Sequence, residues 1–169
     1  MSLDFDHHIT QDLYQASQRE WLETNGLGGW AGSTICGANT RRYHGLLVAA
    51  TRPPAGRMSL LSKLDETIVL NEQDYELGCN LYPQTVHPQG FTYVHRFCKG
   101  LFPHWTYQAA GVELDKTVST VHGENTTLVL YQVTAAPRPL HPQAPTLYFR
   151  PGLSLPGHCQ RGNPQPGYI

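Results

Sequence analysis

The sequence predicts an all-β protein, an antiparallel β-sandwich with little helix and an irregular C-terminal tail. Segments rich in Val, Thr, Tyr and Leu recur along its 169 residues, each short and bounded by Gly, Pro or Asn. Apolar positions within these segments repeat every second residue far more often than with the period of a helix. Turn signals at this spacing are typical of a sandwich of two sheets.

The expected elements follow in order along the chain. A weak helix candidate covers residues 12–18, and a strand-like GLLVAA segment covers residues 45–50. The clearest strands cover residues 58–70, 104–109, 112–121 and 127–134. Residues 113–121 alternate charged or hydroxyl side chains with Leu and Val, as in an antiparallel sheet with one wet face. Residues 123–125, Gly-Glu-Asn, suit a hairpin turn between the last two strands.

Composition changes towards the C-terminus. Residues 137–169 hold eight of the thirteen prolines and no Asp or Glu. Proline cannot donate to a strand ladder and keeps its neighbours extended, so this segment predicts neither a central strand nor a helix. Tyr148 and Phe149 are the last apolar pair that could belong to a strand. We therefore expect one domain over residues 1–150 and a loop or mobile tail over residues 151–169.

Charge and composition argue against several classes of partner. Twelve basic and thirteen acidic side chains, with a pI near 6.7, give no electrostatic footprint for nucleic acid or an anionic membrane. Neutral partners such as sugars remain open. The N-terminal sequence MSLDFDHHIT lacks an apolar run, so we expect neither a signal peptide nor a membrane span. The sequence predicts a cytoplasmic protein.

Cysteines and histidines predict no metal site and no redox motif. The four cysteines contain no CxxC pair and no finger-like spacing, and without an export signal we expect them to stay thiols. They are Cys36, Cys79, Cys98 and Cys159. The nine histidines are scattered, and His7 and His8 lie on a terminus that we expect to fray.

The most informative stretch, residues 19–71, contains a glycine cluster. Gly26, Gly28 and Gly29 allow positive φ and leave the backbone uncovered by side chains. The order G-x-G-G-x-x-G differs from a dinucleotide fingerprint, and no periodic helix follows it to receive a phosphate. Tight turns are therefore the favoured interpretation, with close approach to a sugar or a partner domain as the alternative.

A polar run precedes the strand-like segment. Arg41, Arg42, Tyr43 and His44 offer forked donors, a phenol and an imidazole. If the run is extended, Arg41 and Tyr43 share one face while Arg42 and His44 share the other. This arrangement would present polar groups on a rigid sheet.

Several pieces of this stretch resemble one known family. They are Glu20-Trp21-Leu22, the turn over residues 24–29, residues 39–47 and residues 60–66. In this order they are similar to the N-terminal domain of the archaeal and bacterial type of glycogen debranching enzyme, an amylo-α-1,6-glucosidase. The resemblance implies a supersandwich-like β-domain that precedes a catalytic α/α-barrel. For full members it implies hydrolysis of α-1,6-glucosidic branch linkages without a metal or organic cofactor.

The resemblance weakens through Tyr131 and is lost after about Arg150, so we expect the catalytic barrel to be absent from this chain. A truncated gene, a shifted reading frame and a free-standing domain stay open as explanations. By resemblance the catalytic acids belong to the barrel. Asp65 and Glu66 cannot replace them, because a glycosidase needs carboxyl groups roughly 5 to 9.5 Å apart across one bond, whereas strand neighbours point to opposite faces.

Two interpretations of the polar run remain. With Trp30, it can line a saccharide-facing surface between this domain and the barrel. Alternatively, its arginines neutralise Asp65 and Glu66 on a neighbouring strand. Most tryptophans are core residues, and Trp30 is the exception that we expect at a surface. We predict Trp30, Arg41, Arg42, Tyr43 and His44 as substrate-binding residues, and Gly26, Gly28, Gly29, Asp65 and Glu66 as supporting residues.

The predicted function is that of a non-catalytic domain of a debranching-enzyme-like protein, which binds α-glucan or docks the catalytic barrel. One alternative is an interaction module that pairs with itself, as a homo-oligomer, or with a separate barrel subunit. An exposed apolar patch would favour that module. Another alternative is a small hydrolase around Arg42, His44 and Glu66, which a deep pocket holding all three would favour.

Overall fold

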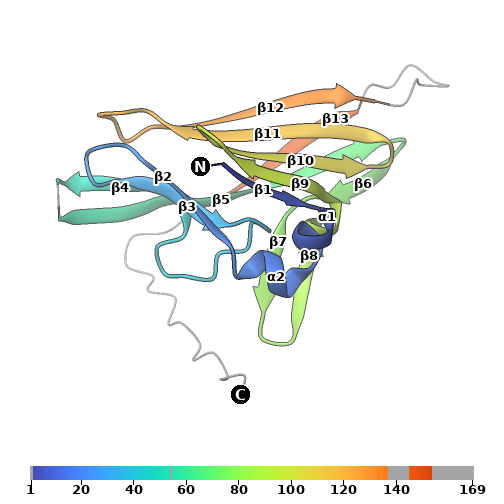
Figure 1. The fold of residues 1–169 in the computed structure, drawn as a ribbon, viewed down its shortest axis with the longest axis horizontal. Coiled ribbons are helices and arrows are strands. Elements are labelled where there is room, and N and C mark those ends of the chain that lie inside the picture. The colour runs from blue at the N-terminus through green and yellow to red at the C-terminus, as the bar shows by residue number, and fades with distance from the viewer. Residues whose placement is uncertain (1, 54, 137–144, 154–169) are drawn as a thin grey trace.

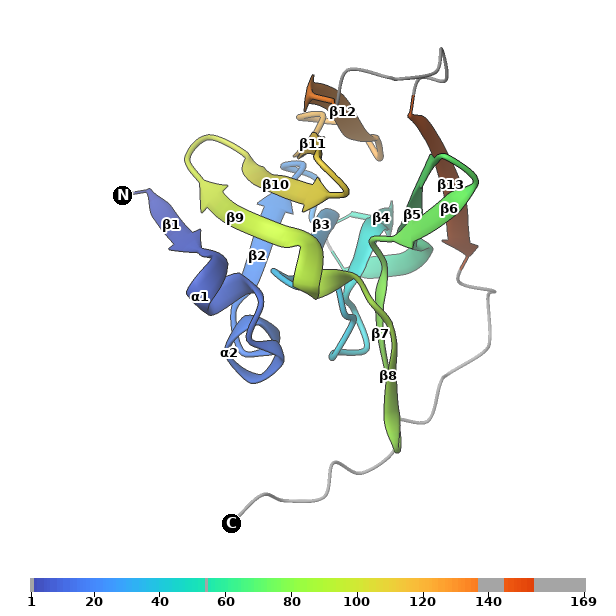
Figure 2. The same ribbon diagram turned by 90° about the vertical axis from the view of Figure 1, so that its right-hand side faces the viewer.

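A computed structural model describes residues 2–53, 55–136 and 145–153, and these form a sandwich of two antiparallel sheets. Figure 1 shows the two layers from one side, and Figure 2 shows them after a quarter turn. The predicted all-β sandwich with little helix is therefore confirmed. No helix of the described part is long and apolar enough to cross a membrane.

The strands are arranged as follows. The first sheet has the order β1 (Leu3–Asp6), β9 (Val94–Lys99), β10 (Pro103–Ala109), β11 (Val112–Thr120) and β12 (Thr127–Ala135). The second sheet has the order β13 (Thr146–Leu153), β5 (Gly56–Leu70), β4 (Gly45–Arg52), β3 (Trp30–Thr34) and β2 (Glu20–Thr24), and β6 (Gln73–Glu76) also pairs with β5. A separate hairpin contains β7 (Cys79–Tyr82) and β8 (Thr85–Gln89). The helical turns are α1 (His7–Thr10), α2 (Leu13–Ser17) and the 3-10 turn η1 (Gly90–Tyr93).

The predicted elements have direct counterparts. The four clearest predicted strands are β5, β10, β11 and β12, and the GLLVAA segment lies in β4. The expected helix is α2, where Asp12 accepts a hydrogen bond from the Gln15 N–H at 2.9 Å. The N-terminus is structured where we expected fraying, because β1 pairs with β9 and Asp6 caps α1 by accepting the His8 N–H at 3.0 Å.

Aromatic side chains fill the core between the sheets. Trp21 of the second sheet meets Trp105 of the first edge-on, with ring centroids 5.3 Å apart. Phe97 lies 5.0 Å from Trp105, and all three are buried. The Trp105 indole donates to the Ile35 carbonyl at 2.8 Å, which ties the first sheet to the loop after β3. Trp21 and Trp105 thus follow the core interpretation.

β13 is an edge strand that continues past the predicted end of the domain. It runs antiparallel to β5, with Phe149 opposite Glu66, and extends through Pro151 to Leu153. An edge strand tolerates proline because one side of its backbone needs no ladder partner. The rest of the predicted tail, residues 154–169, lies outside the described residues.

The second sheet has a gap along β5. β4 pairs with β5 up to Leu61 and β6 pairs with it from Thr67, both on the side away from β13. Within the gap, the Asn39 amide donates to the Ser62 carbonyl at 3.2 Å. Loop residues therefore complete this edge, and the same loop carries the polar run to the outer surface.

Candidate functional site

The glycine cluster forms a tight turn between β2 and β3. Gly26 and Gly28 have φ of 78° and 94°, which other residues rarely adopt. A Cβ on Gly29 would lie 2.7 Å from the Asn25 amide nitrogen. The side-chain oxygen of Asn25 accepts hydrogen bonds from two backbone N–H groups of the turn, at 3.0 and 2.9 Å. The side-chain nitrogen of Asn25 donates to a backbone carbonyl of the β11–β12 turn at 2.8 Å. The turn is thereby fixed, and it positions Trp30 at the start of β3.

Trp30 lies on the outer face of the second sheet. Trp21 points into the core, so Thr24, three residues further along the same strand, points outward. Trp30 is opposite Thr24 in the pairing of β2 with β3 and therefore also points outward. Its indole donates to the Tyr43 carbonyl at 3.1 Å, and the two rings meet edge-on with centroids 6.1 Å apart. The Arg57 guanidinium lies 5.0 Å from the Trp30 ring centroid. Arg57 Nε also donates to a carbonyl of the glycine turn at 2.7 Å. Sequence reasoning missed Arg57.

Arg41 to Tyr43 form a turn instead of the extended segment that we expected. The His44 N–H donates to the Arg41 carbonyl at 3.1 Å, and β4 begins only at Gly45. The expected alternation of faces is therefore wrong. Arg42 lies over the Tyr43 ring, 5.3 Å from its centroid, so these two side chains lie together.

Arg41 and His44 converge on Glu20, a β2 residue to which sequence reasoning gave no role in the site. Arg41 Nε donates to Glu20 Oε1 at 2.5 Å, and His44 Nε2 lies 3.5 Å from the same oxygen. Burial lowers the pKa of His44, although the Glu20 carboxylate opposes this. The His44 side chain is 8% exposed and accepts the Thr40 N–H at Nδ1, at 3.1 Å. His44 thus holds the turn and presents little surface to a ligand.

The outward side chains of this region form one aromatic and cationic cluster. It consists of Trp30, Arg42, Tyr43 and Arg57, which we call the Trp30 surface.

Residues 19–160 of the chain match the family model described as glycogen debranching enzyme N terminal. The chain belongs to this family. No curated protein and no solved structure matches it.

In this glycogen debranching enzyme N-terminal domain, Asp65 and Glu66 point to opposite faces of β5. Asp65 lies 2.7 Å from Lys63 Nζ. Glu66 is buried, and its Oε1 accepts hydrogen bonds from Lys116 Nζ and the Tyr131 hydroxyl, each at 2.5 Å. The expectation that arginines of the polar run neutralise these carboxylates is therefore wrong, because lysines do so.

A small cavity lies beside Glu66, between the core and the gap in the second sheet. Its volume is about 30 Å³. The Trp21 indole N–H, at its lining, has no hydrogen-bond partner among the described residues. Such a cavity holds about one or two waters, whereas ligand pockets span roughly 300–1,000 Å³. Neither Arg42 nor His44 lines it, so the groups of the hydrolase alternative do not share a pocket.

An open groove of about 620 Å³ runs between β6 and the segment from β8 to η1. Its lining includes Asp74, Glu76, His87, Thr92 and Tyr93. His87 Nε2 lies 3.9 Å from a Glu76 oxygen, and in the described part of the chain no three acidic, histidine or cysteine side chains gather as metal ligands would. Sequence reasoning missed this groove, because its residues are dispersed over three elements.

The sandwich is open along β12 and β13, which are the outermost strands of their sheets among the described residues. Phe149 is opposite inward-facing Glu66 and Val133 is opposite inward-facing Leu114, so both point between the sheets. They are nevertheless 46% and 49% exposed. β12 also lacks the charges and prolines that usually protect an edge strand. We call Leu128, Leu130, Val133, Tyr148 and Phe149 the open edge.

Proposed function

We propose that this domain binds α-glucan chains on the Trp30 surface and does not hydrolyse them by itself. The observation that carries the proposal is the pair of adjacent rings, Trp30 and Tyr43, with Arg42 and Arg57 beside them. Flat rings suit the C–H faces of sugars, and guanidinium groups can donate to their hydroxyls. Trp30 and Arg57 come from β3 and β5, and Arg42 and Tyr43 come from the turn before β4.

Binding at such a surface is weak. It is open, so a sugar stays largely hydrated, and each guanidinium lies over a ring face that a sugar would use. Asp65 and Glu66 do not supply a hydrolytic pair, because Asp65 is paired with Lys63 and Glu66 is buried against Lys116. Two free carboxyl groups across one bond would be needed.

Titration with maltooligosaccharide is expected to shift the NMR signals of Trp30 and Tyr43 first, with a dissociation constant on the order of millimolar. Trp30→Ala should weaken binding roughly two- to tenfold, since an aromatic contact contributes roughly 0.5–1.5 kcal/mol. Arg42→Ala should weaken binding while the melting temperature hardly changes, because Arg42 is exposed and pairs with no buried carboxylate of the described residues.

Tyr14→Ala is the matched control, because Tyr14 is 74% exposed on α2 and lies outside the Trp30 surface. This variant should bind maltooligosaccharide like the unmodified protein. A cellooligosaccharide, whose β-linkages give a flat chain, separates α-glucan recognition from general stacking on sugars. The proposal fails if millimolar sugar leaves Trp30 and Tyr43 unperturbed, or if Tyr14→Ala weakens binding as much as Trp30→Ala.

A second candidate function is docking of a catalytic α/α-barrel, on the same chain or a separate one. The observation that favours it is the open edge, where Val133 and Phe149 point into the sandwich yet remain half exposed. Burying apolar surface contributes roughly 25 cal/mol per Å², so covering these side chains would stabilise an assembly. β12 carries no charged side chain and is the outermost strand of its sheet among the described residues, so it can also pair through its backbone.

Without a barrel, the open edge is expected to pair two copies of the chain. Sedimentation velocity at high concentration should show a dimer, and Leu130→Lys should shift it to monomer because lysine protects edge strands. Leu130 is opposite outward-facing Thr117, so the substitution leaves the core intact. The control is Leu101→Lys, since Leu101 is 80% exposed in the loop after β9. Monomeric unmodified protein, or equal dissociation by both substitutions, would contradict docking through this edge.

A further inference from the structure

An open groove lies between β6 and the segment from β8 to η1, and we call it the β6 groove. Its volume of about 620 Å³ falls within the roughly 300–1,000 Å³ that ligand pockets span. Its lining shares no residue with the Trp30 surface. The groove is therefore a separate place at which a small ligand can bind.

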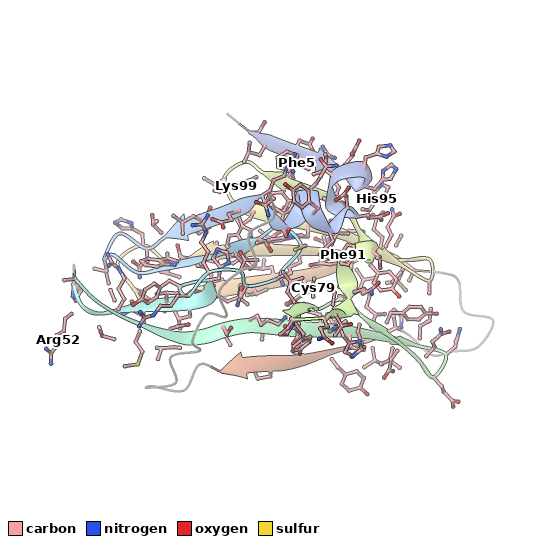
Figure 3. All side chains as sticks on the ribbon, turned by 90° about the horizontal axis from the view of Figure 1, so that it is seen from below. Phe5, Arg52, Cys79, Phe91, His95 and Lys99 are labelled. Atoms are coloured by element: carbon pink, nitrogen blue, oxygen red, sulfur yellow. The ribbon has the colours of Figure 1, made fainter. Side chains whose placement is uncertain are left out.

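Both walls of the groove are anchored to the core. Tyr93 of η1 meets Tyr75 of β6 edge-on, with ring centroids 6.3 Å apart, and Tyr75 packs against the core. The Leu77 N–H, directly after β6, donates to a β5 carbonyl at 2.8 Å. The hairpin β7–β8 projects beyond the two sheets (Figure 1), and Figure 3 shows Cys79 and Phe91, at its base, in the interior of the molecule. These contacts fix the shape of the groove before a ligand arrives.

The polar side chains of the groove are acceptors and neutral donors. Asp74 and Glu76 are exposed on β6 and present carboxylates, which only accept hydrogen bonds. His87 and Gln89 can donate and accept, and the Thr92 hydroxyl, which donates to a β8 carbonyl at 2.8 Å, can still accept. No described residue of the lining is lysine or arginine, so an anion finds no cationic partner there. The groove therefore favours a ligand that donates hydrogen bonds.

The apolar part of the lining is limited to Tyr93, Val86 and Pro88. The flat ring of Tyr93 suits the C–H face of a sugar, whose hydroxyls can then reach the carboxylates of β6. A divalent cation fits less well, because it needs several oxygen ligands. In the described part of the chain, no three acidic, histidine or cysteine side chains gather in that way.

We propose that the β6 groove is a second sugar-binding subsite of the domain, which takes a short stretch of a neutral α-glucan chain. Hydroxyls of the sugar donate to Asp74 and Glu76, and such charge-assisted hydrogen bonds are roughly twice as strong as neutral ones. His87 and Gln89 contact the sugar from the β8 wall, and Tyr93 lies against its ring. The proposal rests on the proposed function for the kind of sugar, whereas the groove itself does not depend on the Trp30 surface.

The two subsites lie on the same face of the second sheet. Tyr75 points into the core, so its neighbour Glu76 points to the outer face, which also carries Trp30. Glu76 is opposite Thr67 of β5, ten residues along that strand from Arg57 of the Trp30 surface. A strand advances roughly 3.3 Å per residue, so roughly 33 Å of β5 separates the subsites. A long glucan chain that reaches both gains affinity over a short one, because its second contact is intramolecular.

The test titrates the isotope-labelled full chain with maltotriose, which is too short to bridge the two subsites, and follows both by NMR. Signals of Asp74 and Tyr93 report the β6 groove, and those of Trp30 and Tyr43 report the Trp30 surface. We expect both groups of signals to shift at millimolar sugar. Glu76→Gln should weaken binding at the groove about fivefold, since a neutral amide accepts a hydroxyl less strongly than a carboxylate does. The shifts of Trp30 and Tyr43 should stay unchanged in this variant.

Glu72→Gln is the matched control for Glu76→Gln. Glu72 is exposed in the turn between β5 and β6, so this variant loses the same charge next to β6 without changing the lining. It should bind maltotriose at the groove like the unmodified chain. Glu76→Gln should fold normally, because the Glu76 side chain is 51% exposed and its carboxylate lies as far as 3.9 Å from His87.

The outcomes separate this subsite from the proposed function and from other ligands. Shifts at Trp30 and Tyr43 alone would overturn the second subsite and leave the proposed function standing, whereas shifts at the groove alone would support the subsite and contradict the Trp30 surface. Millimolar putrescine, a diamine, should not displace maltotriose from the groove. Groove shifts with putrescine but not with maltotriose would overturn the sugar subsite, as would equal weakening by Glu72→Gln and Glu76→Gln.

Discussion

Lys116→Met is expected to lower the free energy of unfolding by roughly 3–5 kcal/mol, because it leaves the Glu66 carboxylate buried without its cation. Glu66 and Lys116 are 3% and 8% exposed, so water screens their interaction little. Lys116 also lies 5.6 Å from the Trp105 ring centroid and 5.9 Å from that of Tyr131, contacts that the substitution removes. Urea unfolding followed by circular dichroism at neutral pH measures this loss.

Two further variants separate loss of charge pairing from loss of packing. Replacing Glu66 and Lys116 together by methionine should recover most of the stability, because a buried pair exchanged for apolar side chains is often neutral. Arg96→Met should change stability far less than Lys116→Met, since its pair with Asp4 is exposed to solvent. A Lys116→Met protein within 1 kcal/mol of the unmodified one would show that Glu66 does not depend on this cation.

The strands of the first sheet could be predicted because their period-two pattern survives in half-buried segments. β11 buries Val112, Leu114 and Val118 on one face, and β10 buries alternate residues in the same way. α1 and β13 were harder for different reasons. The four residues of α1 are too few to show a helical period. Pro151 argued against a strand, because the local sequence does not reveal that β13 lies at the edge of its sheet, where proline is tolerated.

Three members of the Trp30 surface were predicted from the sequence, but Arg57 was missed, and so were the contacts among the four side chains. Trp30 and Tyr43 were singled out, yet their contact depends on the turn that places Tyr43 beside β3. The cation that neutralises Glu66 was missed because it depends on the packing of β11 against β5. One local signal was present: Lys116 shares its alternation with Leu114 and Val118, so it lies on the apolar face of its strand.

Gly90→Ala is expected to destabilise the fold by roughly 3 kcal/mol or more, since overpacking and a lost buried hydrogen bond add together. A Cβ on Gly90, the first residue of η1, would lie 2.0 Å from both the carbonyl carbon and the carbonyl oxygen of Leu77. These are backbone atoms next to the gap in the second sheet, so no side chain can rotate away to make room. The Gly90 N–H also donates to the Gly78 carbonyl at 2.8 Å, and this bond must break if the segments separate.

Gly100→Ala is the matched control, because a Cβ at Gly100 would meet nothing within 4 Å. Surface changes of this kind usually stay within about 0.5 kcal/mol. Leu77 and Cys79 belong to the core, so separation of this segment by Gly90→Ala should expose apolar surface and lower the urea midpoint. The close packing of Gly90 against Leu77 would be contradicted if the two alanine variants unfolded at the same urea concentration.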